Sequence, residues 1–248
     1  MARVLIPLPD ADFDVTEAAV PWRLLSDAGH EVVFATETGT AAAGDPLLLR
    51  GVLLGKLGAD PEPRRFYAQM IESREFRSPI RWEAIEPDRY DALVLPGGHA
   101  PGMRQYLGSE LLQRRVAAFW KLERPVAAIC HGVLVLARSK DPATGKSVLH
   151  AARTTSLTKA QEWVAYAISF WKLGRYYRTY PAYVEDEVRA ALDSPAQYLR
   201  GPLALTARGT ATDDSAAFVV EDGRYLSARW PGDAYLFARK LVALLAAR

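Results

Sequence analysis

The sequence predicts an α/β protein in which helices flank a parallel sheet. Three observations support this fold class. The chain opens with the pattern of a strand, a helix and a second strand, which is typical of a parallel sheet. Two later segments, Ala92–Leu95 and Val126–Ile129, are short, apolar and composed of small or branched residues, as in strands buried on both faces. Turn residues and a helical pattern follow each of these two segments.

The composition is that of one soluble globular domain. The chain has 248 residues, of which 50% are apolar, so it can bury one large core, and we expect a single domain over 1–248. Lys and Arg number 31 against 29 Asp and Glu, which gives no reason to expect a nucleic-acid or membrane partner. With one cysteine no intramolecular disulfide can form, and the apolar start is too short for a signal peptide. We therefore expect a cytoplasmic protein.

The first elements are well marked. Arg3–Leu8 is predicted as a buried strand, and His30–Ala35 as the second strand. The helix between them begins at Asp14 or Thr16, either of which can cap it, and Gly29 can end it.

Two long segments are predicted as insertions on this scaffold. Thr36–Asp91 contains an apolar piece, Leu47–Leu57, and a helix near Arg64–Ser73. Leu157–Tyr198 is dense in aromatic residues, which we interpret as the core of a helical insertion rather than as a surface that stacks on a ligand. Those aromatic residues are Trp163, Tyr166, Phe170, Trp171, Tyr176, Tyr177, Tyr180, Tyr183 and Tyr198.

The remaining elements follow from caps and turns. A helix is expected over Ser109–Leu122, with Ser109 as its cap. A hairpin is predicted through Asp222–Gly223, and a closing helix, Ala234–Ala247, is expected to be capped by Asp233.

Cys130 stands where chemistry is expected. It ends the strand Val126–Ile129 and is followed by His131, Gly132 and the helical run Val133–Ala137, so the pattern predicts a sharp strand-to-helix turn, or nucleophile elbow. Such a turn lifts the thiol to the carboxyl edge of the sheet and places it at a helix N-terminus, where a thiolate is stabilised. An inert buried cysteine is the alternative interpretation, and this arrangement disfavours it.

Three further features are expected at the same edge of the sheet. The loop Pro96–Gly102 follows the neighbouring strand, and its glycines either allow a ligand close to the backbone or simply form a tight turn. Glu17 begins the first helix, where a carboxylate is also ordinary helix-dipole chemistry. His131 could act as a base, although a histidine beside the nucleophile is a weak signal by itself. We expect both insertions to wall in Cys130.

These residues resemble the ThiJ/PfpI superfamily, whose fold is the flavodoxin-like, class I glutamine amidotransferase-like one. The resemblance rests on the helix start Thr16–Pro21, the loop Leu95–His99 and the elbow Ala128–Gly132. The insertions and the histidine after the two glycines are similar to the larger members, in the heat-shock chaperone and glyoxalase III branch.

The resemblance implies a role for each matching residue. Cys130 would be the nucleophile, Glu17 would hydrogen-bond its sulfur in the protonated state, and His131 would be the base. Backbone N–H groups of Gly98 and His131 would form an oxyanion hole. The loop that binds the oxyanion and the substrate would comprise Gly97, Gly98 and His99. No cofactor and no metal are implied.

The chain departs from the family pattern at the third member of the triad. Larger members have an acid about thirty positions after the cysteine, whereas Arg153–Lys159 contains none. Glu162 or a residue of a partner subunit could take its place. The His-x-Glu of glutamine amidotransferases is also absent, because His150 is followed by two alanines.

Three functions stay open on the sequence alone. The first is an enzyme that acts on a small reactive carbonyl or related electrophile, as a glyoxalase or a hydrolase. The second is a redox-responsive stress protein or chaperone with little turnover, and the third is an inactive scaffold. The expected partners are a small-molecule substrate and further copies of the chain, in a homodimer or higher homo-oligomer.

Overall fold

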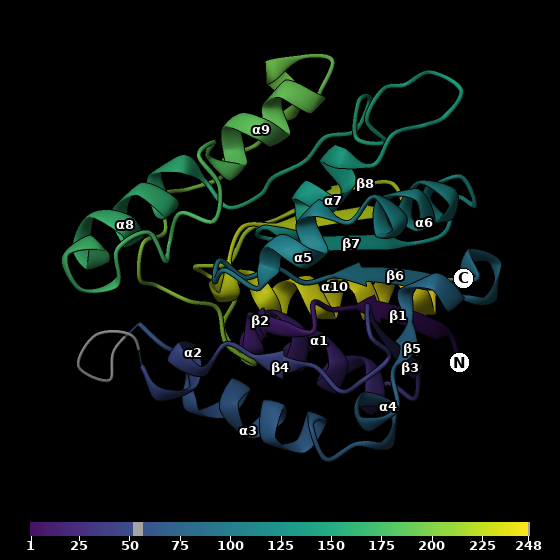
Figure 1. The fold of residues 1–248 in the computed structure, drawn as a ribbon, viewed down its shortest axis with the longest axis horizontal. Coiled ribbons are helices and arrows are strands. Elements are labelled where there is room, and N and C mark those ends of the chain that lie inside the picture. Colours follow the sequence, from purple (N-terminus) through teal and green to yellow (C-terminus); the bar gives the residue numbers. More distant parts are fainter. Residues whose placement is uncertain (52–56, 248) are drawn as a thin grey trace.

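The computed structural model describes residues 1–51 and 57–247, and its centre is a seven-stranded sheet of order β5-β3-β1-β6-β7-β9-β8 (Figure 1). Only β8 runs antiparallel to its neighbour, and the other pairs are parallel. The fold class predicted from the sequence is therefore confirmed. The strands are β1 (Arg3–Pro7), β3 (Glu31–Thr36), β5 (Ile80–Arg81), β6 (Ala92–Leu95), β7 (Val126–Ile129), β8 (Val219–Asp222) and β9 (Tyr225–Ala228).

Helices cover both faces of the sheet (Figure 1). On one face α1 (Val15–Asp27) packs against α10 (Ala234–Ala246), and α3 (Pro61–Met70) packs on the outer side of α1. The other face carries α5, α6 and α7, of which α7 packs against the other two helices and against β6 and β7. The bounds of these three helices are Met103–Gly108, Glu110–Trp120 and Gly132–Arg138.

The first helix begins where the sequence predicts it. Asp14 is the N-cap of α1, and its Oδ1 accepts hydrogen bonds from the amides of Thr16 at 2.8 Å and Glu17 at 3.1 Å. Pro21 lies inside the helix, in its second turn. Glu17 is fully buried in the first turn, and it faces the sheet edge rather than solvent.

The insertion over 36–91 contributes short elements. It holds α2 (Pro46–Arg50), α3 and α4 (Arg74–Arg77), two 3-10 turns, Trp82–Ala84 and Pro87–Arg89, and the edge strand β5. Its strand β4 (Ala43–Gly44) pairs with β2 (Ala11–Phe13) in a separate two-stranded sheet. The helix expected near 64–73 lies slightly earlier, as α3. The apolar piece expected over 47–57 falls partly outside the described residues.

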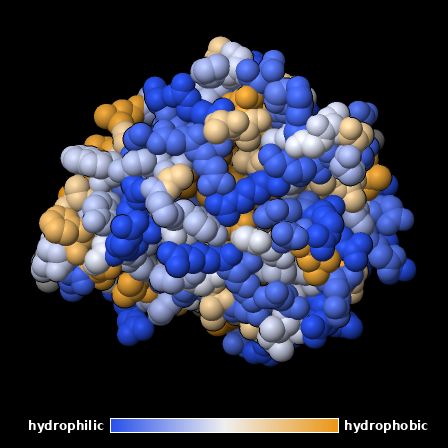
Figure 2. Space-filling model, turned by 45° about the horizontal axis from the view of Figure 1, so that its top comes forward, coloured by the Kyte–Doolittle hydropathy of each residue, from blue (hydrophilic) through white to orange (hydrophobic). Residues whose placement is uncertain are grey.

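The insertion over 157–198 is helical, as predicted. It contains α8 (Lys159–Leu173), α9 (Val184–Ala191) and the 3-10 turn Pro195–Gln197. The interpretation of its aromatic residues as a core is wrong for α8, where Trp163, Phe170 and Trp171 are 56%, 53% and 69% exposed. The buried residues of α8 are instead Gln161, Glu162 and Ser169. Polar side chains cover most of the face in Figure 2, with apolar ones scattered among them.

The carboxyl-terminal elements match the prediction, except for one cap. The hairpin β8–β9 turns at Asp222–Gly223, and Gly223 has the positive φ of 60° that this tight turn requires. Asp233 precedes α10 without a side-chain capping bond. Its carboxylate is instead paired with the buried Arg229 at 2.8 Å, because that guanidinium has no access to water.

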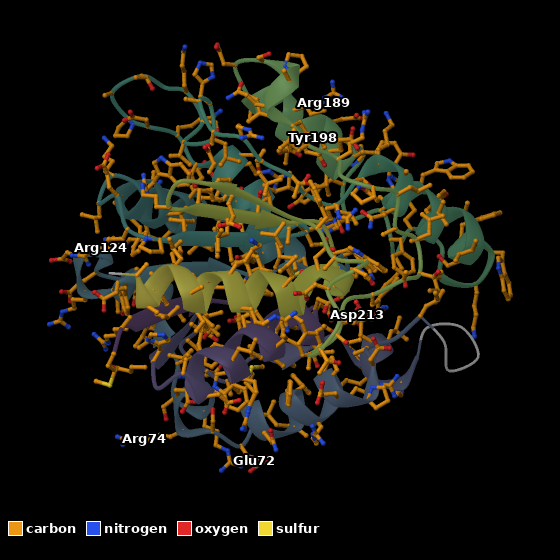
Figure 3. All side chains as sticks on the ribbon, turned by 180° about the vertical axis from the view of Figure 1, so that it is seen from behind. Glu72, Arg74, Arg124, Arg189, Tyr198 and Asp213 are labelled. Carbon is orange, nitrogen blue, oxygen red and sulfur yellow. The ribbon has the colours of Figure 1, made fainter. Side chains whose placement is uncertain are left out.

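The two insertions lie on opposite faces of the sheet. Figure 3 shows Glu72 and Arg74 at one end of the view and Arg189 and Tyr198 at the other. They approach each other where the parallel strands end, because α2 and α8 both lie beyond the carboxyl ends of these strands (Figure 1). None of the helices in residues 1–51 and 57–247 has the length and apolarity that crossing a bilayer requires.

Candidate active site

Cys130 forms a sharp elbow between β7 and α7. Its backbone is in the left-handed region, with φ of 58°, which a non-glycine residue adopts only at some energetic cost. The amide of Cys130 donates to the carbonyl of Ala228 at 3.0 Å, so the neighbouring strand β9 holds the elbow. The next residue but one, Gly132, has to be a glycine, because a Cβ at this position would lie 2.0 Å from the carbonyl oxygen of Leu95.

Glu17 lies against the thiol. One carboxyl oxygen, Oε2, accepts a hydrogen bond from the amide of Gly97 at 2.8 Å, while Oε1 is buried without a hydrogen-bond partner and the carboxyl interacts with the Cys130 side chain. Burial and the nearby Asp14 raise the pKa of Glu17 well above its usual value. The raised pKa favours the protonated form of Glu17, which can donate its proton toward the sulfur.

The structure differs from the expectation of a low-pKa thiol. Cys130 is 3% exposed, and this burial raises its pKa well above the usual value. One interaction acts in the opposite direction, because the His131 amide donates a hydrogen bond to the sulfur. The helix N-terminus alone does not outweigh the loss of water around the thiol.

His131 is the residue nearest to the thiol on its other side. Its Nδ1 lies 3.5 Å from Cys130 Sγ. Burial, His99 and Arg138 lower the pKa of His131 to about 3, so the imidazole is neutral. It can accept a proton from the thiol but does not form a permanent ion pair with it.

Within residues 1–51 and 57–247, no carboxylate is hydrogen-bonded to the His131 ring, where the family pattern has an acid. Glu162 is engaged elsewhere: its carboxylate accepts from the Val184 amide at 3.0 Å and lies 3.5 Å from Arg178 Nε. The group next to His131 Nε2 is the hydroxyl of Thr179, at 3.5 Å. Thr179 belongs to the connection between α8 and α9, residues 174–183.

The loop after β6 presents a histidine and two glycines to the site, as the sequence predicts. The His99 ring stacks on Tyr177 with centroids 4.2 Å apart and meets Tyr176 edge-on at 4.8 Å. Gly97 uses its amide to hold Glu17, so that amide is not free for a bound oxyanion. Gly98 has φ of 146° and packs so closely on the helix start that a Cβ would lie 2.9 Å from the Asp14 amide.

Both insertions meet above this loop. The Tyr176 hydroxyl, from the α8–α9 connection, donates to Asp45 just before α2. Asp45 and Asp14 are both buried, and burial raises the pKa of Asp14 to about 6. The two inserted segments are thus in direct contact through Tyr176 and Asp45, and Cys130 itself is buried.

The groups that could hold a metal are not assembled here. Among the described residues, no three His, Cys, Asp or Glu side chains come together as a cation site.

Sequence reasoning brought Cys130, His131, Glu17 and His99 to one place but missed Thr179. A threonine in an irregular segment carries no catalytic pattern, and only the bend of the chain after α8 brings it to the histidine. The adjacent tyrosines Tyr176 and Tyr177 were the one signal in the sequence that this segment packs against another part of the protein. Two neighbouring aromatic side chains carry a large apolar area that is stabilised by burial.

Known proteins share the family and the fold of this chain. A family model described as ThiJ/PfpI family-like matches residues 8–202. A deglycase of Pyrococcus abyssi is 29% identical over 98% of this chain and 99% of its own, and glyoxalase 3 of Candida albicans is 24% identical over 60% and 61%. The crystal structure of the Candida albicans glyoxalase III has a TM-score of 0.68 at 20% identity, covering 98% of this chain and 97% of that one. The Francisella tularensis rapid encystment protein has a TM-score of 0.71 at 18% identity, over 99% of both chains. The chain belongs to the ThiJ/PfpI-like family.

Proposed function

We propose that this protein is a cofactor-independent enzyme that uses Cys130 to attack a small reactive carbonyl compound or a related electrophile. The observation that carries the proposal is the position of the thiol between two proton-handling groups. The Glu17 carboxyl interacts with the Cys130 side chain, and His131 Nδ1 lies 3.5 Å from the sulfur. A purely structural cysteine needs neither neighbour.

In the first step the sulfur adds to the carbonyl carbon. The S–C bond forms as the carbonyl π bond opens, and the thiol proton passes through His131 to the oxygen, which leaves a hemithioacetal. While charge develops on that oxygen, the backbone amide of Gly98 would stabilise it, since the His131 amide already donates to the sulfur. Protonated Glu17 would donate a hydrogen bond to the sulfur during the attack. An ionised carboxylate at this position would instead repel the thiolate.

With methylglyoxal as the substrate, the remaining steps need only water. His131 would remove the proton from the carbon bonded to sulfur and return it to the adjacent carbon, while the hydroxyl proton passes to the neighbouring oxygen, so that the hemithioacetal becomes a thioester of lactate. Hydrolysis of this thioester takes up one water, releases lactate and restores the thiol. No external oxidant or reductant enters. The relatives named deglycase and glyoxalase 3 support activity of this class.

The test is turnover of methylglyoxal to lactate and of glycated amino acids to free amino acids. We expect slow activity that Cys130→Ser abolishes and His131→Asn lowers strongly. His150→Asn is the matched control, since His150 lies outside the site and pairs with Asp193 at 3.2 Å. Equal rates for the wild type and Cys130→Ser on every substrate would refute the enzymatic function.

One observation favours a second candidate, a redox-responsive stress protein. Cys130 is only 3% exposed, which limits access to the sulfur to small molecules such as a peroxide. In that case hydrogen peroxide would convert the thiol to a sulfenic or sulfinic acid at stoichiometric concentrations. Mass spectrometry of the Cys130 peptide, combined with absent turnover, would favour this function over the first.

A further inference from the structure

The hydroxyl of Thr179 lies on the side of the His131 ring that faces away from the thiol. Thr179 Oγ1 is 3.5 Å from His131 Nε2, while Nδ1 of the same ring is 3.5 Å from Cys130 Sγ. Thr179 is 3% exposed and His131 is 1% exposed, so little water competes for either contact. The hydroxyl therefore occupies the position that an orienting acid would take in a triad.

The hydrogen bonds around this hydroxyl have one possible direction. Thr179 Oγ1 lies 2.6 Å from the carbonyl oxygen of His99, and a carbonyl can only accept. The single hydroxyl proton is thus committed to His99, and the oxygen turns its lone pairs toward the imidazole. His131 must then donate from Nε2, which leaves Nδ1 unprotonated and facing the thiol.

We propose that Thr179 is a positioning residue that fixes His131 in the Nε2–H tautomer and so keeps Nδ1 free to take the proton of Cys130. The inference rests on the proposed function, in which Cys130 is the nucleophile. A neutral hydroxyl selects the tautomer without stabilising an imidazolium as a carboxylate does. The expected consequence is an enzyme that functions with a neutral histidine and turns over slowly.

The segment that carries Thr179 is braced from two directions. The guanidinium of Arg104, in α5, donates to the Thr179 carbonyl at 2.9 Å. The preceding Arg178 lies 3.5 Å from Glu162 and 3.6 Å above the Tyr183 ring. These contacts hold the backbone of an otherwise irregular connection, so the hydroxyl meets the imidazole in a fixed orientation.

The experiment compares Thr179→Val, which keeps the shape and removes the hydroxyl, with Thr179→Ser, which retains it. The first readout is the tautomer of His131, measured by nitrogen NMR of the imidazole. The second is the rate of Cys130 alkylation by iodoacetamide at neutral pH. The matched control is Thr36→Val, which also removes a buried hydroxyl bonded to a carbonyl, here Thr40 at 2.9 Å.

In the wild type and Thr179→Ser we expect the Nε2–H tautomer. In Thr179→Val we expect a mixture of tautomers and alkylation slower by about fivefold, the effect of losing one ordinary hydrogen bond. Thr36→Val should change neither readout. A wild type whose Nε2 is unprotonated, or a Thr179→Val variant with unchanged tautomer and rate, would overturn the inference.

A charged substitution adds a pH readout. Thr179→Asp would place a carboxylate beside Nε2, while the other groups facing His131 stay as they are: Cys130 from the elbow, His99 from the β6 loop and Arg138 from α7. We expect the pKa of His131 to rise from about 3 toward its ordinary value. An unshifted imidazole in a folded Thr179→Asp protein would contradict the proposed contact.

These readouts separate the inference from the function on which it rests. Neither the tautomer nor the alkylation rate requires turnover. If Cys130→Ser retains full activity, the enzymatic function fails, even where Thr179 still sets the tautomer. If turnover depends on Cys130 but not on the hydroxyl, the inference alone fails.

Discussion

The elbow and the α8–α9 connection both reach His131, but different forces hold them. Cys130 ends a strand, and its amide is bonded to Ala228 of the neighbouring strand at 3.0 Å. Thr179 lies outside regular structure and is held through the long side chain of Arg104. We therefore expect substitutions at the elbow to damage fold and chemistry together. Substitutions around the connection should change the chemistry at a smaller cost in stability.

The largest effect is expected for Gly132→Ala. The new Cβ would lie 2.0 Å from the carbonyl of Leu95 and 2.7 Å from that of Pro96, both backbone atoms that cannot move aside. The elbow must open or the sheet edge must shift, which should lower the free energy of unfolding by about 3 kcal/mol or more. Urea unfolding followed by circular dichroism measures this loss.

The control for this substitution is Gly145→Ala. Gly145 has φ of 69°, and a Cβ at this position would have no atom within 4 Å, so only the backbone conformation resists a side chain. We expect a cost of about 1 kcal/mol there. If both variants lose the same stability, close packing at the elbow is not the reason for Gly132.

The next effect concerns the proton on Glu17. Burial raises the pKa of Glu17, so its protonated carboxyl supports the thiolate, and Glu17→Leu should slow alkylation of Cys130 at pH 7 by about tenfold. Glu17→Gln keeps a donor for the sulfur and an acceptor for the Gly97 amide, so its rate should stay within a few-fold of wild type. The rate is measured with iodoacetamide from pH 5 to 10.

Faster alkylation of both Glu17 variants would show that Glu17 is ionised in the wild type. If Glu17 were ionised, either substitution would remove a negative charge from beside the sulfur. The pKa of Cys130 would then fall, and both variants would react faster than wild type. Unfolding in urea should accompany the rates, because Glu17→Leu also leaves the Gly97 amide without its 2.8 Å partner.

The elbow could be predicted from sequence because each part stands at the end of a regular element. Cys130 follows an apolar strand and Glu17 opens a helix with a capped start, so the rules for parallel sheets bring both to one edge. The strands Ala92–Leu95 and Val126–Ile129 match the observed β6 and β7. Here local pattern and global fold agree.

The surroundings of the elbow could not be predicted in the same way. Thr179 is 48 residues from His131 and 80 from His99, and its position depends on how two insertions fold over the sheet. The expectation of a low-pKa thiol, which was based on the helix N-terminus, was wrong for a similar reason. Burial raises the pKa of Cys130, and the burial of this turn depends on the packing of the whole fold rather than on the local sequence.

A smaller effect is expected from Glu162, which braces the α8–α9 connection. Burial raises its pKa from 4.5 to about 7, so the folded protein holds this proton more tightly than the unfolded chain does. The stability that this bound proton contributes to the folded protein is fully present below pH 4.5 and is lost as the pH rises through about 7. Between pH 5 and 7.5 the free energy of unfolding should fall, by on the order of 1 kcal/mol from this group.

Glu162→Gln removes that titration while keeping an acceptor for the Val184 amide. The variant should show a shallower fall of stability with pH. Part of the fall should persist, because burial also raises the pKa of Asp14, from 3.8 to about 6. Identical pH profiles for wild type and Glu162→Gln, from urea unfolding in matched buffers, would show that Glu162 does not contribute to the fall.

The smallest effect is expected on the outer side of the same insertion, at Trp171. This side chain is 69% exposed, and its indole donates only to the carbonyl of Ile168 in its own helix, at 3.1 Å. Trp171→Ala should therefore change the free energy of unfolding by no more than about 0.5 kcal/mol. Trp82→Ala is the matched comparison, because Trp82 is fully buried and donates to Ala35 at 3.1 Å, and it should cost about 3 to 5 kcal/mol. A loss at Trp171 as large as the one at Trp82 would show that the aromatic residues of α8 are buried in solution, by another part of the chain or by a second copy.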